Sequence, residues 1–407
     1  MTRTGFARGA WLTWLLALAT ALAVCAAPPS PPASAPDAVP AALTRLFNAA
    51  EVREGFFTPA IRGTGFADSV AGIRDDTLEA HGALRGVRED EAFWLLDFDE
   101  AVVPVFARLD AEGGFTTLWF NLTEPRTPPT RADIEQVLPE FGGTVSLLVE
   151  RDGELLFARD ADTPLAVGSA FKLLVLRALQ QQQATGRLPA DASLSLAQQH
   201  VSLPSGRLQD APVGSAHRIA TLAEDMIRLS DNTATDVLID ALGRDALEAL
   251  SPRNTPFLDT GAVFRLKDPR NADLLAQWRV GDTAARRGVL DALASRPLPP
   301  LSVFDAGPVA LDVEWFLSAR ELCAALRAVG FAPAVVQNPG HLDPSRWARV
   351  AYKGGSEPGV INQSFLLEDT AGRTACVVGT WNNEAGMVTL PFLRLMSHLV
   401  RLARELP

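Results

Sequence analysis

The chain has 407 residues, which is too long for one ordinary domain and long enough for two that each bury a hydrophobic core. Hydrophobic residues make up 47% and charged residues 21%, a balance that excludes a disordered chain. The formal net charge of -11 would repel phosphate backbones. Since no run of basic residues offsets this charge, we expect no nucleic-acid partner.

The first 25 residues have the layout of a secretory signal peptide. Basic residues precede an apolar run, residues 10–24, which is shorter than the roughly 20 residues that span a bilayer as a stable helix. We therefore predict that residues 1–25 are a signal and that the protein is exported, to the periplasm or the cell envelope. A lipoprotein anchored at Cys25 is the alternative, because residues 22–25 resemble a bacterial lipobox, although Val24 is large for its position.

Two cysteines remain after the predicted signal, Cys323 and Cys376, and they are too few for a disulfide framework. Neither they nor the five scattered histidines show a spacing that suits a metal ion. We expect two buried free thiols, with a single bridge as the alternative in an oxidising compartment. The sequence therefore predicts no metal and no cofactor.

The first folded part is predicted to be a small α+β domain over residues 39–127. Residues 26–38 before it are rich in proline, alanine and serine and are interpreted as an extended tether. A helical segment at residues 41–50 is followed by three strand-like runs, and the short turns between the runs favour antiparallel hairpins. The three runs are residues 91–97, 101–109 and 115–121.

Three aromatic residues of this domain, Trp94, Trp119 and Phe120, allow two interpretations. Packing in the core is the first, and lining of a hydrophobic pocket is the second. The sequence leaves open whether the domain binds a ligand or only docks against its neighbour.

The second domain, residues 134–407, is predicted to open with a β-hairpin. Strand-like runs at residues 144–150 and 155–159 flank a turn at Asp152. A long helical pattern runs from Ser169 to about Gln183, and a mostly helical middle follows. Because strands come from both ends with helices between them, we expect an α+β fold with one antiparallel sheet against a helical lobe. The late strands are residues 349–353, 361–368 and 374–380, before a terminal helix at residues 391–406.

Lysine is rare in this chain. Only three of the 37 lysine and arginine residues are lysines, namely Lys172, Lys267 and Lys353. Arginine cannot give up its proton in a protein, whereas lysine can when its surroundings lower its pKa. The retained lysines therefore indicate places where arginine cannot serve.

The first chemical motif places Ser169 three residues before Lys172 at the predicted start of a helix. This spacing sets both side chains on one helical face, about one turn apart. A neutral lysine there can take the serine proton and make the hydroxyl nucleophilic. The free backbone N–H groups at a helix start can stabilise an anionic intermediate.

Two further motifs follow along the chain. Ser230 and Asn232 offer a hydroxyl that can carry a proton to a leaving nitrogen and an amide that can bind an amide-bearing substrate. Lys353 lies on a predicted strand and is suited to hold a substrate carboxylate. Gly355 lets a substrate lie close to the strand backbone, and Ser356 follows it. Each motif alone is common in ordinary helix ends and strands.

Their order along the chain is the informative feature. The sequence S-x-x-K, S-D-N and K-x-G, each present once, resembles the active-site signature of class A beta-lactamases and penicillin-binding proteins. The resemblance implies a class A beta-lactamase or transpeptidase-like catalytic domain. It also implies the roles of nucleophile for Ser169, base for Lys172, proton relay for Ser230, amide ligand for Asn232 and carboxylate anchor for Lys353. The oxyanion hole would be the N–H groups of Ser169 and Ser356.

Other segments resemble the narrower Cpe/LpqF family of exported serine hydrolases. That family joins a small NTF2-like domain to a class A beta-lactamase-like domain, and the resemblance covers about residue 39 to the C-terminus. The segments that carry it are residues 205–206, 230–236, 241–244 and 353–360.

Two departures from class A beta-lactamases bear on activity. Their loop with the pattern Glu-x-x-x-Asn, whose carboxylate activates the deacylating water, has no counterpart between Asn232 and Lys353, and Asp268 with Asn271 is interpreted as a turn. Gly354 stands where a threonine or serine is usual. We therefore expect an acyl-enzyme that forms and then hydrolyses slowly.

These residues together predict a secreted serine hydrolase with a small-molecule substrate. The main hypothesis is cleavage of a beta-lactam or a related amide or ester, with weak beta-lactamase activity. The alternatives are an esterase for small acyl groups and a catalytically quiet binding protein of the cell envelope. The sequence does not predict the natural substrate or the oligomeric state.

Overall fold

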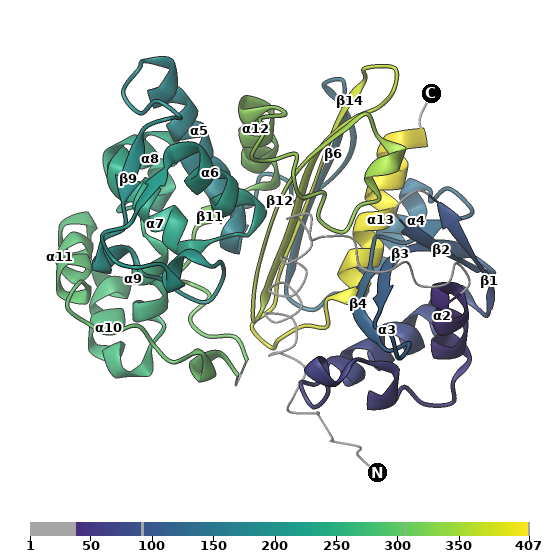
Figure 1. Ribbon diagram of the computed structural model, residues 1–407. Coiled ribbons are helices and arrows are strands. Elements are labelled where there is room, and N and C mark those ends of the chain that lie inside the picture. Colours follow the sequence, from purple (N-terminus) through teal and green to yellow (C-terminus); the bar gives the residue numbers. More distant parts are fainter. Residues whose placement is uncertain (1–37, 91–92, 306, 406–407) are drawn as a thin grey trace, which may run out of the picture. The chain divides into compact units, whose positions relative to one another are not determined.

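The computed structural model describes residues 38–90, 93–305 and 307–405 (Figure 1). The predicted signal, nearly all of the tether and Cys25 lie outside these residues. No helix in the described part is long and apolar enough to cross a bilayer. The chain forms two compact units, here called unit 1 and unit 2. Their described parts are residues 38–90, 93–134, 341–343 and 388–405 for unit 1, and residues 135–305, 307–340 and 344–387 for unit 2.

Unit 1 contains an antiparallel sheet with strand order β1-β2-β3-β4, and β5 pairs with β3. The three predicted strands are confirmed within a few residues, whereas β1 and the helix α3 are additions that the sequence did not indicate. The elements are α2 (Ala38–Asn48), α3 (Phe66–His81), β1 (Leu84–Asp90), β2 (Phe93–Phe98), β3 (Ala101–Leu109), β4 (Phe115–Phe120), β5 (Glu124–Pro125), α4 (Arg131–Val137, which reaches into unit 2) and α13 (Leu390–Glu405).

The core of unit 1 lies where α2 packs against β1 and β3. The buried residues of α2 recur at helical spacing, so that one face of the helix is apolar. Phe47 of this face meets Phe98 of β2 edge to face, with ring centroids 5.4 Å apart. The C-terminal helix α13 also belongs to unit 1, whereas the sequence analysis assigns residues 391–406 to the second domain.

Unit 2 is built on an antiparallel five-stranded sheet with the order β12-β13-β14-β6-β7. The first hairpin turns at Asp152 and Gly153, which both have positive φ, as a tight hairpin requires. The predicted joining of early and late strands in one sheet is confirmed. The strands are β6 (Thr144–Arg151), β7 (Glu154–Arg159), β12 (Arg349–Glu357), β13 (Val360–Glu368) and β14 (Thr374–Asn382).

The helices of unit 2 gather into a lobe around α5, as Figure 1 shows. Helix α5 is buried along most of its first seven residues, so it forms the centre of the lobe. The predicted helical middle is confirmed. The helices are α5 (Lys172–Ala184), α6 (Ile219–Arg228), α7 (Asn232–Leu242), α8 (Arg244–Leu250), α9 (Thr260–Leu266), α10 (Ala272–Val280), α11 (Thr283–Leu293) and α12 (Ala319–Val329), and short strands are β8 (Leu165–Ala166), β9 (Ser193–Ser195), β10 (Ala216–Arg218) and β11 (Phe316–Leu317).

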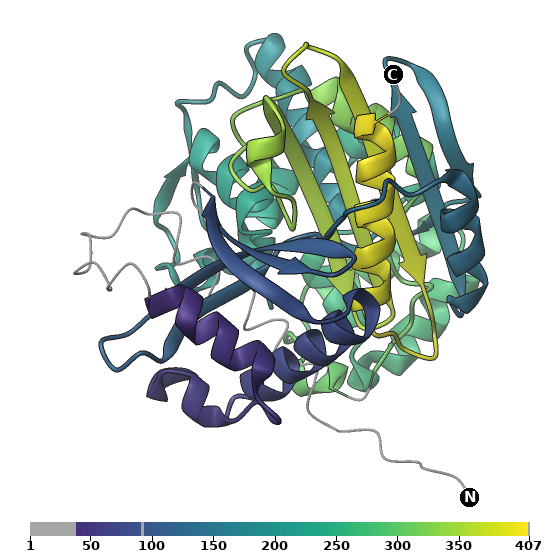
Figure 2. The ribbon, with the colours of Figure 1, turned by 90° about the vertical axis from the view of Figure 1, so that its right-hand side faces the viewer.

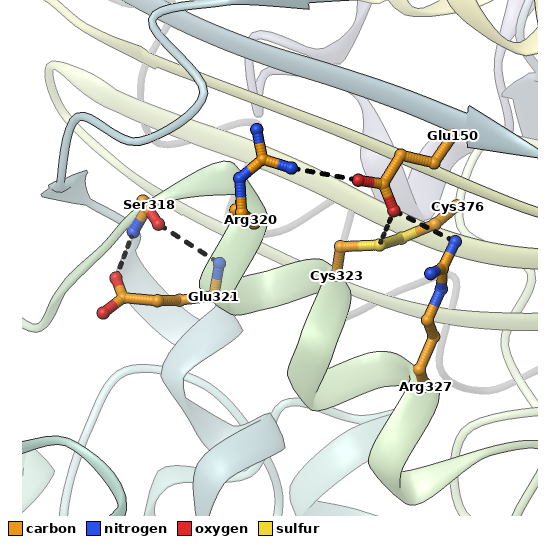
Figure 3. Close-up of a disulfide and its surroundings, with 7 residues drawn as sticks. All are labelled: Glu150, Ser318, Arg320, Glu321, Cys323, Arg327 and Cys376. Carbon is orange, nitrogen blue, oxygen red and sulfur yellow. Dashed lines mark hydrogen bonds and ion pairs between the residues drawn. A yellow bond between two sulfur atoms is a disulfide. The ribbon is translucent and has the colours of Figure 1, made fainter. Parts of the chain in front are cut away.

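Helix α12 links the lobe to the sheet, because it packs against both α5 and β14. It starts with a capping box, in which Ser318 Oγ accepts from the N–H of Glu321 and Glu321 Oε2 accepts from the N–H of Ser318. Cys323 of α12 forms a disulfide with Cys376 of β14, with Cα atoms 6.0 Å apart (Figure 3). The expectation of two free thiols is therefore wrong, because the fold brings these positions into contact.

The disulfide closes a long loop and should stabilise unit 2 mainly by restricting its unfolded chain. The cysteines are 53 residues apart, and disulfides typically stabilise a fold by about 2–4 kcal/mol. We expect the double variant Cys323→Ser/Cys376→Ser to lose about this amount in the free energy of unfolding, measured by urea denaturation. The reduced parent protein should unfold at the same urea concentration as the variant, and equal midpoints for the oxidised parent and the variant would contradict this expectation.

Candidate active site

Ser169 lies in a 3-10 turn, Gly168–Phe171, that leads directly into α5. The sequence predicts that the α-helix begins at Ser169, whereas it begins at Lys172. Gly168 has a φ of +49°, a left-handed conformation that favours glycine. The tight turn directs the chain from β8 into the buried helix, and this brings the Ser169 hydroxyl next to the Lys172 amine.

The Lys172 side chain is fully buried at the centre of the site. Its Nζ lies 3.2 Å from Ser169 Oγ and 3.2 Å from Ser230 Oγ. It lies closer to two carbonyl oxygens, Ser230 O and Asn232 Oδ1, each at 2.6 Å. The structure therefore brings together the first two motifs, which are separated by 58 residues in the sequence.

These contacts suit a neutral amine. Burial lowers the pKa of Lys172 to about 7, although the negative charges of Asp231 and Asp236 oppose the shift. Two N–H groups of the neutral amine can donate to the two close carbonyl oxygens, Ser230 O and Asn232 Oδ1. The nitrogen lone pair then remains for a hydroxyl hydrogen, and Ser169 Oγ is within reach of it. The arrangement can accept the serine proton.

Ser230 has an unusual backbone conformation that serves these contacts. Its φ is +55°, a region that residues other than glycine rarely adopt. In this conformation both its carbonyl and its hydroxyl oxygen lie within hydrogen-bonding distance of Lys172 Nζ. Ser205 Oγ donates to the same carbonyl at 2.7 Å. Backbone strain that persists in a packed site is a common mark of function.

Asp231 and Asn232, which follow Ser230 in the second motif, hold the motif in place. Asp231 caps α7, where its Oδ1 accepts from the N–H of Ala234, and its Oδ2 accepts from the N–H groups of Arg207 and Leu208. A side chain at Gly206 would overlap with the Asp231 carboxyl group. Asn232 Nδ2 donates to Leu203 O at 3.0 Å, so both polar atoms of its amide are engaged. Its role as a substrate ligand stays a prediction.

Lys353 on β12 completes the cluster. Its Nζ donates to Ser230 Oγ at 3.0 Å and to Gly354 O at 2.7 Å, and its side chain is buried. Burial, and then the neighbouring Lys172, lower the pKa of Lys353 well below its ordinary value. The hydroxyl of Ser230 therefore lies between the amines of Lys172 and Lys353. Lys353 is 123 residues from Ser230 in the sequence. Such a hydroxyl can pass a proton between the Lys172 side and a group bound near Lys353.

Backbone N–H groups converge where β12 passes the 3-10 turn. A Cβ at Gly355 would come within 2.6 Å of Ser169 N, and a Cβ at Gly168 would come within 3.1 Å of Ser356 N. Only a residue without a side chain permits this approach at Gly355. The N–H groups of Ser169 and Ser356, predicted to form the oxyanion hole, lie on the two backbones that meet here.

The unusual Gly354 has a structural explanation. A Cβ at this position would overlap with the hydroxyl of Tyr352, two residues earlier on the same face of β12. The Tyr352 ring packs against Phe365 with centroids 4.9 Å apart, and burial raises the pKa of its hydroxyl. Tyr352 thus occupies the space that a threonine side chain at residue 354 would take.

No carboxylate of the described chain lies within hydrogen-bonding distance of Ser169, Lys172, Ser230 or Lys353. Asp268, the sequence's nearest candidate, caps the 3-10 turn Pro269–Asn271 and forms an ion pair with Arg270. Its interpretation as a turn residue agrees with the structure. The nearby buried Asp236 accepts from the backbone N–H groups of Thr260 and Gly261. Neither carboxylate takes the place of a deacylating base.

The third lysine forms a buried cluster that the sequence analysis did not identify. Lys267 Nζ lies 2.9 Å from Glu314 Oε1 and 2.5 Å from Glu357 Oε1. Two carboxylates share one ammonium group, and burial together with Glu314 raises the pKa of Glu357. Because Glu357 directly follows Ser356, this cluster fixes the end of β12 beside the predicted oxyanion hole. The rarity of lysine in the sequence was the signal that could have pointed to Lys267.

The described residues contain no group of three or more histidine, cysteine, aspartate or glutamate side chains that could hold a metal ion.

Comparisons with known proteins agree with this geometry in part. Residues 129–255 match the family model described as "Beta-lactamase enzyme family", and this stretch contains the first two motifs. No curated protein matches the chain. Together with the sheet and helical lobe of unit 2, the family match confirms the predicted beta-lactamase-like α+β class. The Cpe/LpqF family and the NTF2-like class of unit 1 stay predictions.

Several solved structures are similar to about two thirds of the chain. A beta-lactamase from Sphaerobacter thermophilus DSM 20745 has a TM-score of 0.46 and 18% identity, over 67% of this chain and 94% of that chain. A protein titled PBP-A has a TM-score of 0.45 and 18% identity, over 69% and 97%. A beta-lactamase from Burkholderia phymatum has a TM-score of 0.46 and 16% identity, over 67% and 95%. At these scores the likeness carries no conclusion on its own.

The lowered pKa of Lys172 predicts how acylation depends on pH. The neutral amine is the form that accepts the Ser169 proton, and its fraction increases as the pH rises through about 7. We expect acylation by p-nitrophenyl acetate to be about tenfold faster at pH 8 than at pH 6, with a plateau above. This ester has no carboxylate, so the charge of Lys353 does not affect its binding.

The control for this profile is Lys172→Arg, whose guanidinium stays protonated over the whole range. It should acylate at a small, pH-independent rate. A flat profile in the parent protein would show that Lys172 is not the base. Stopped-flow absorbance of the released nitrophenol gives both profiles.

The contact between Tyr352 and Gly354 predicts energetic coupling. Gly354→Ala should destabilise the parent protein by about 1–3 kcal/mol, because the new methyl group meets the tyrosine hydroxyl. In a Tyr352→Leu background this cost should fall by about 1 kcal/mol or more. Gly288→Ala, whose new Cβ meets nothing within 4 Å in helix α11, is the control and should change the stability by the same amount in both backgrounds. Urea unfolding of the four variants measures the cycle, and additive costs at Gly354 would contradict it.

Proposed function

We propose that this protein is an exported serine hydrolase that opens beta-lactams, or cleaves related amides and esters, through an acyl-enzyme on Ser169. The observation that carries the proposal is the fully buried Lys172 amine, 3.2 Å from both Ser169 Oγ and Ser230 Oγ. The match of residues 129–255 to the beta-lactamase family model supports the same chemistry. The resemblance to the Cpe/LpqF family motifs supports export and the narrower family.

In acylation one proton moves from Ser169 to the leaving atom, and the carbonyl carbon exchanges its bond to the leaving atom for a bond to Ser169 Oγ. Ser169 Oγ attacks the substrate carbonyl carbon while its proton passes to Lys172 Nζ. The carbonyl oxygen becomes an anion and accepts from the N–H groups of Ser169 and Ser356. The carbon–nitrogen bond of the lactam, or the carbon–oxygen bond of an ester, then breaks, and Ser230 Oγ delivers the proton to the leaving atom. Ser169 is left as an acyl ester.

Deacylation is the slow step of this proposal. Water must attack the acyl ester, and a base must remove a proton from that water. Within the described part of the chain no carboxylate contacts the four catalytic side chains, so Lys172 is the base available for this step. An acyl-enzyme that persists, and hence weak beta-lactamase activity, follows from this arrangement.

Esterase activity on small acyl groups is the second candidate, and Gly354 favours it. A beta-lactam carries a carboxylate that a hydroxyl at this position would help to bind, whereas a simple ester needs no such contact. Tyr352 fills the space instead. Turnover of nitrocefin and p-nitrophenyl acetate, compared as kcat/KM, discriminates between the two activities.

The direct test is mass spectrometry of the intact protein after incubation with benzylpenicillin. We expect one covalent adduct per chain in the parent protein and in Ser295→Ala, which alters an exposed serine of unit 2. The adduct should be absent in Ser169→Ala. It should persist long enough to be isolated because deacylation lacks a carboxylate base.

Two results would contradict the proposal. An adduct that survives in Ser169→Ala would place the reaction on another residue. If neither benzylpenicillin nor an activated ester acylates the parent protein, the catalytically quiet binding role remains, and the serine site is inactive.

A further inference from the structure

A cavity of about 80 Å³ lies within unit 1, and all of its lining residues belong to that unit. Two helices contribute one face each. The residues from α3 are spaced at positions 66, 69, 70, 73 and 77, and those from α13 at positions 390, 393, 394 and 397. Such spacing places all side chains of a helix on one side. Strand β4 and the three residues after it supply a third wall, and Figures 1 and 2 show the three elements in the fold.

The cavity walls are mainly apolar, with Ile73, Leu118 and Leu393 among them. At one end the Trp119 ring stacks on His341, with centroids 4.6 Å apart and planes within 7° of parallel. Burial lowers the pKa of His341 to about 4, so that this ring carries no charge near neutral pH. The body of a matching ligand must therefore be apolar.

Arg394 is the one charged residue among the described residues that line the cavity, and no acidic side chain lines it. Its Nη1 donates to the backbone oxygen of Asp76 at 3.2 Å. Within the described residues it forms no ion pair, although Asp76 lies near enough for its charge to act on Arg394. A guanidinium group has five N–H donors, so most of them remain for another partner.

Asn121 supplies a second donor, and this one has no partner. Asn121 lines the cavity and is 8% exposed. Its Oδ1 accepts from Trp119 Nε1 at 3.1 Å, which fixes the orientation of the amide. Its Nδ2 is buried and has no hydrogen-bonding partner. A buried donor left unpaired destabilises the folded protein, and an acceptor atom of a ligand would relieve that cost.

We propose that this cavity binds a small carboxylic acid with an apolar body, in its anionic form. The carboxylate accepts from the Arg394 guanidinium and from Asn121 Nδ2, and the alkyl part packs on the side chains of α3, β4 and α13. Charge complementarity favours an anionic ligand, since the lining residues carry one positive charge and no negative charge.

The size of the cavity limits the ligand. A dry cavity of roughly 150 Å³ holds benzene, and this one has about half that volume. Since benzene has six non-hydrogen atoms, a short acid of about three to five non-hydrogen atoms is a suitable probe, such as propanoate. Its neutral amide, propanamide, has the same number of non-hydrogen atoms and the same shape, but it has no charge and an NH₂ group replaces one acceptor oxygen.

Isothermal titration calorimetry of the full chain with this acid and this amide tests the site. We expect saturable binding of the acid, at least tenfold tighter than that of the amide. Arg394→Gln should remove this preference, and Asn121→Leu should weaken the binding of both ligands. Because the preference is a ratio within each variant, a change in stability does not imitate it.

Two control variants separate the cavity from other cationic sites. Arg404→Gln alters an arginine of the same helix that does not line the cavity, and it should bind the acid like the parent protein. Lys353→Met removes a cation of the catalytic site and should also leave binding unchanged, so the result does not depend on the proposed hydrolase activity. Three results would overturn the proposal: no saturable binding, equal affinity for acid and amide, or loss of binding in Lys353→Met.

Discussion

The burial of the Lys172 amine is the constraint on which the rest of unit 2 depends. An amine in an apolar interior needs acceptors, and it obtains two close carbonyl oxygens, Ser230 O and Asn232 Oδ1. To present these oxygens, Ser230 takes a left-handed conformation. The loop at residues 202–208 holds it there, because Ser205 donates to the Ser230 carbonyl and a backbone N–H of the loop donates to Asp231. The acidic residues nearby accept from backbone N–H groups instead of pairing with the amine, and the amine therefore stays able to titrate near pH 7.

The sequence was sufficient to predict which residues lie together at the site, because the proposed chemistry requires particular residue types. Only lysine can act as a titratable amine, and only a residue without a side chain fits at Gly355 against the turn at Ser169. Both requirements can be recognised in a single sequence, as a rare lysine and as a glycine. Strand-like runs on either side of a short turn likewise predicted strands of the main sheet, and the helical pattern after Ser169 predicted α5.

What the sequence could not predict depends on contacts between distant segments. The Cys323–Cys376 bridge needs α12 to lie against β14, and two cysteines 53 residues apart carry no sign of this. The Lys267 cluster joins three charged residues from separate segments. Helix α3 was missed because its buried face is not purely apolar, since the polar residues Arg74 and Thr77 are among those that it buries. In each case tertiary packing, and not local pattern, determines the outcome.

All three lysines lie in the interior, with exposures of 0%, 2% and 3% for Lys172, Lys267 and Lys353. Arginine supplies every positive side chain on the surface, and guanidinium groups react poorly with amine-directed reagents. Acetylating or cross-linking agents that target lysine would therefore meet no exposed lysine amine in the described part of the chain. Any such label that attaches to a lysine side chain would report an opening of unit 2, because each amine is exposed only when its buried cluster comes apart.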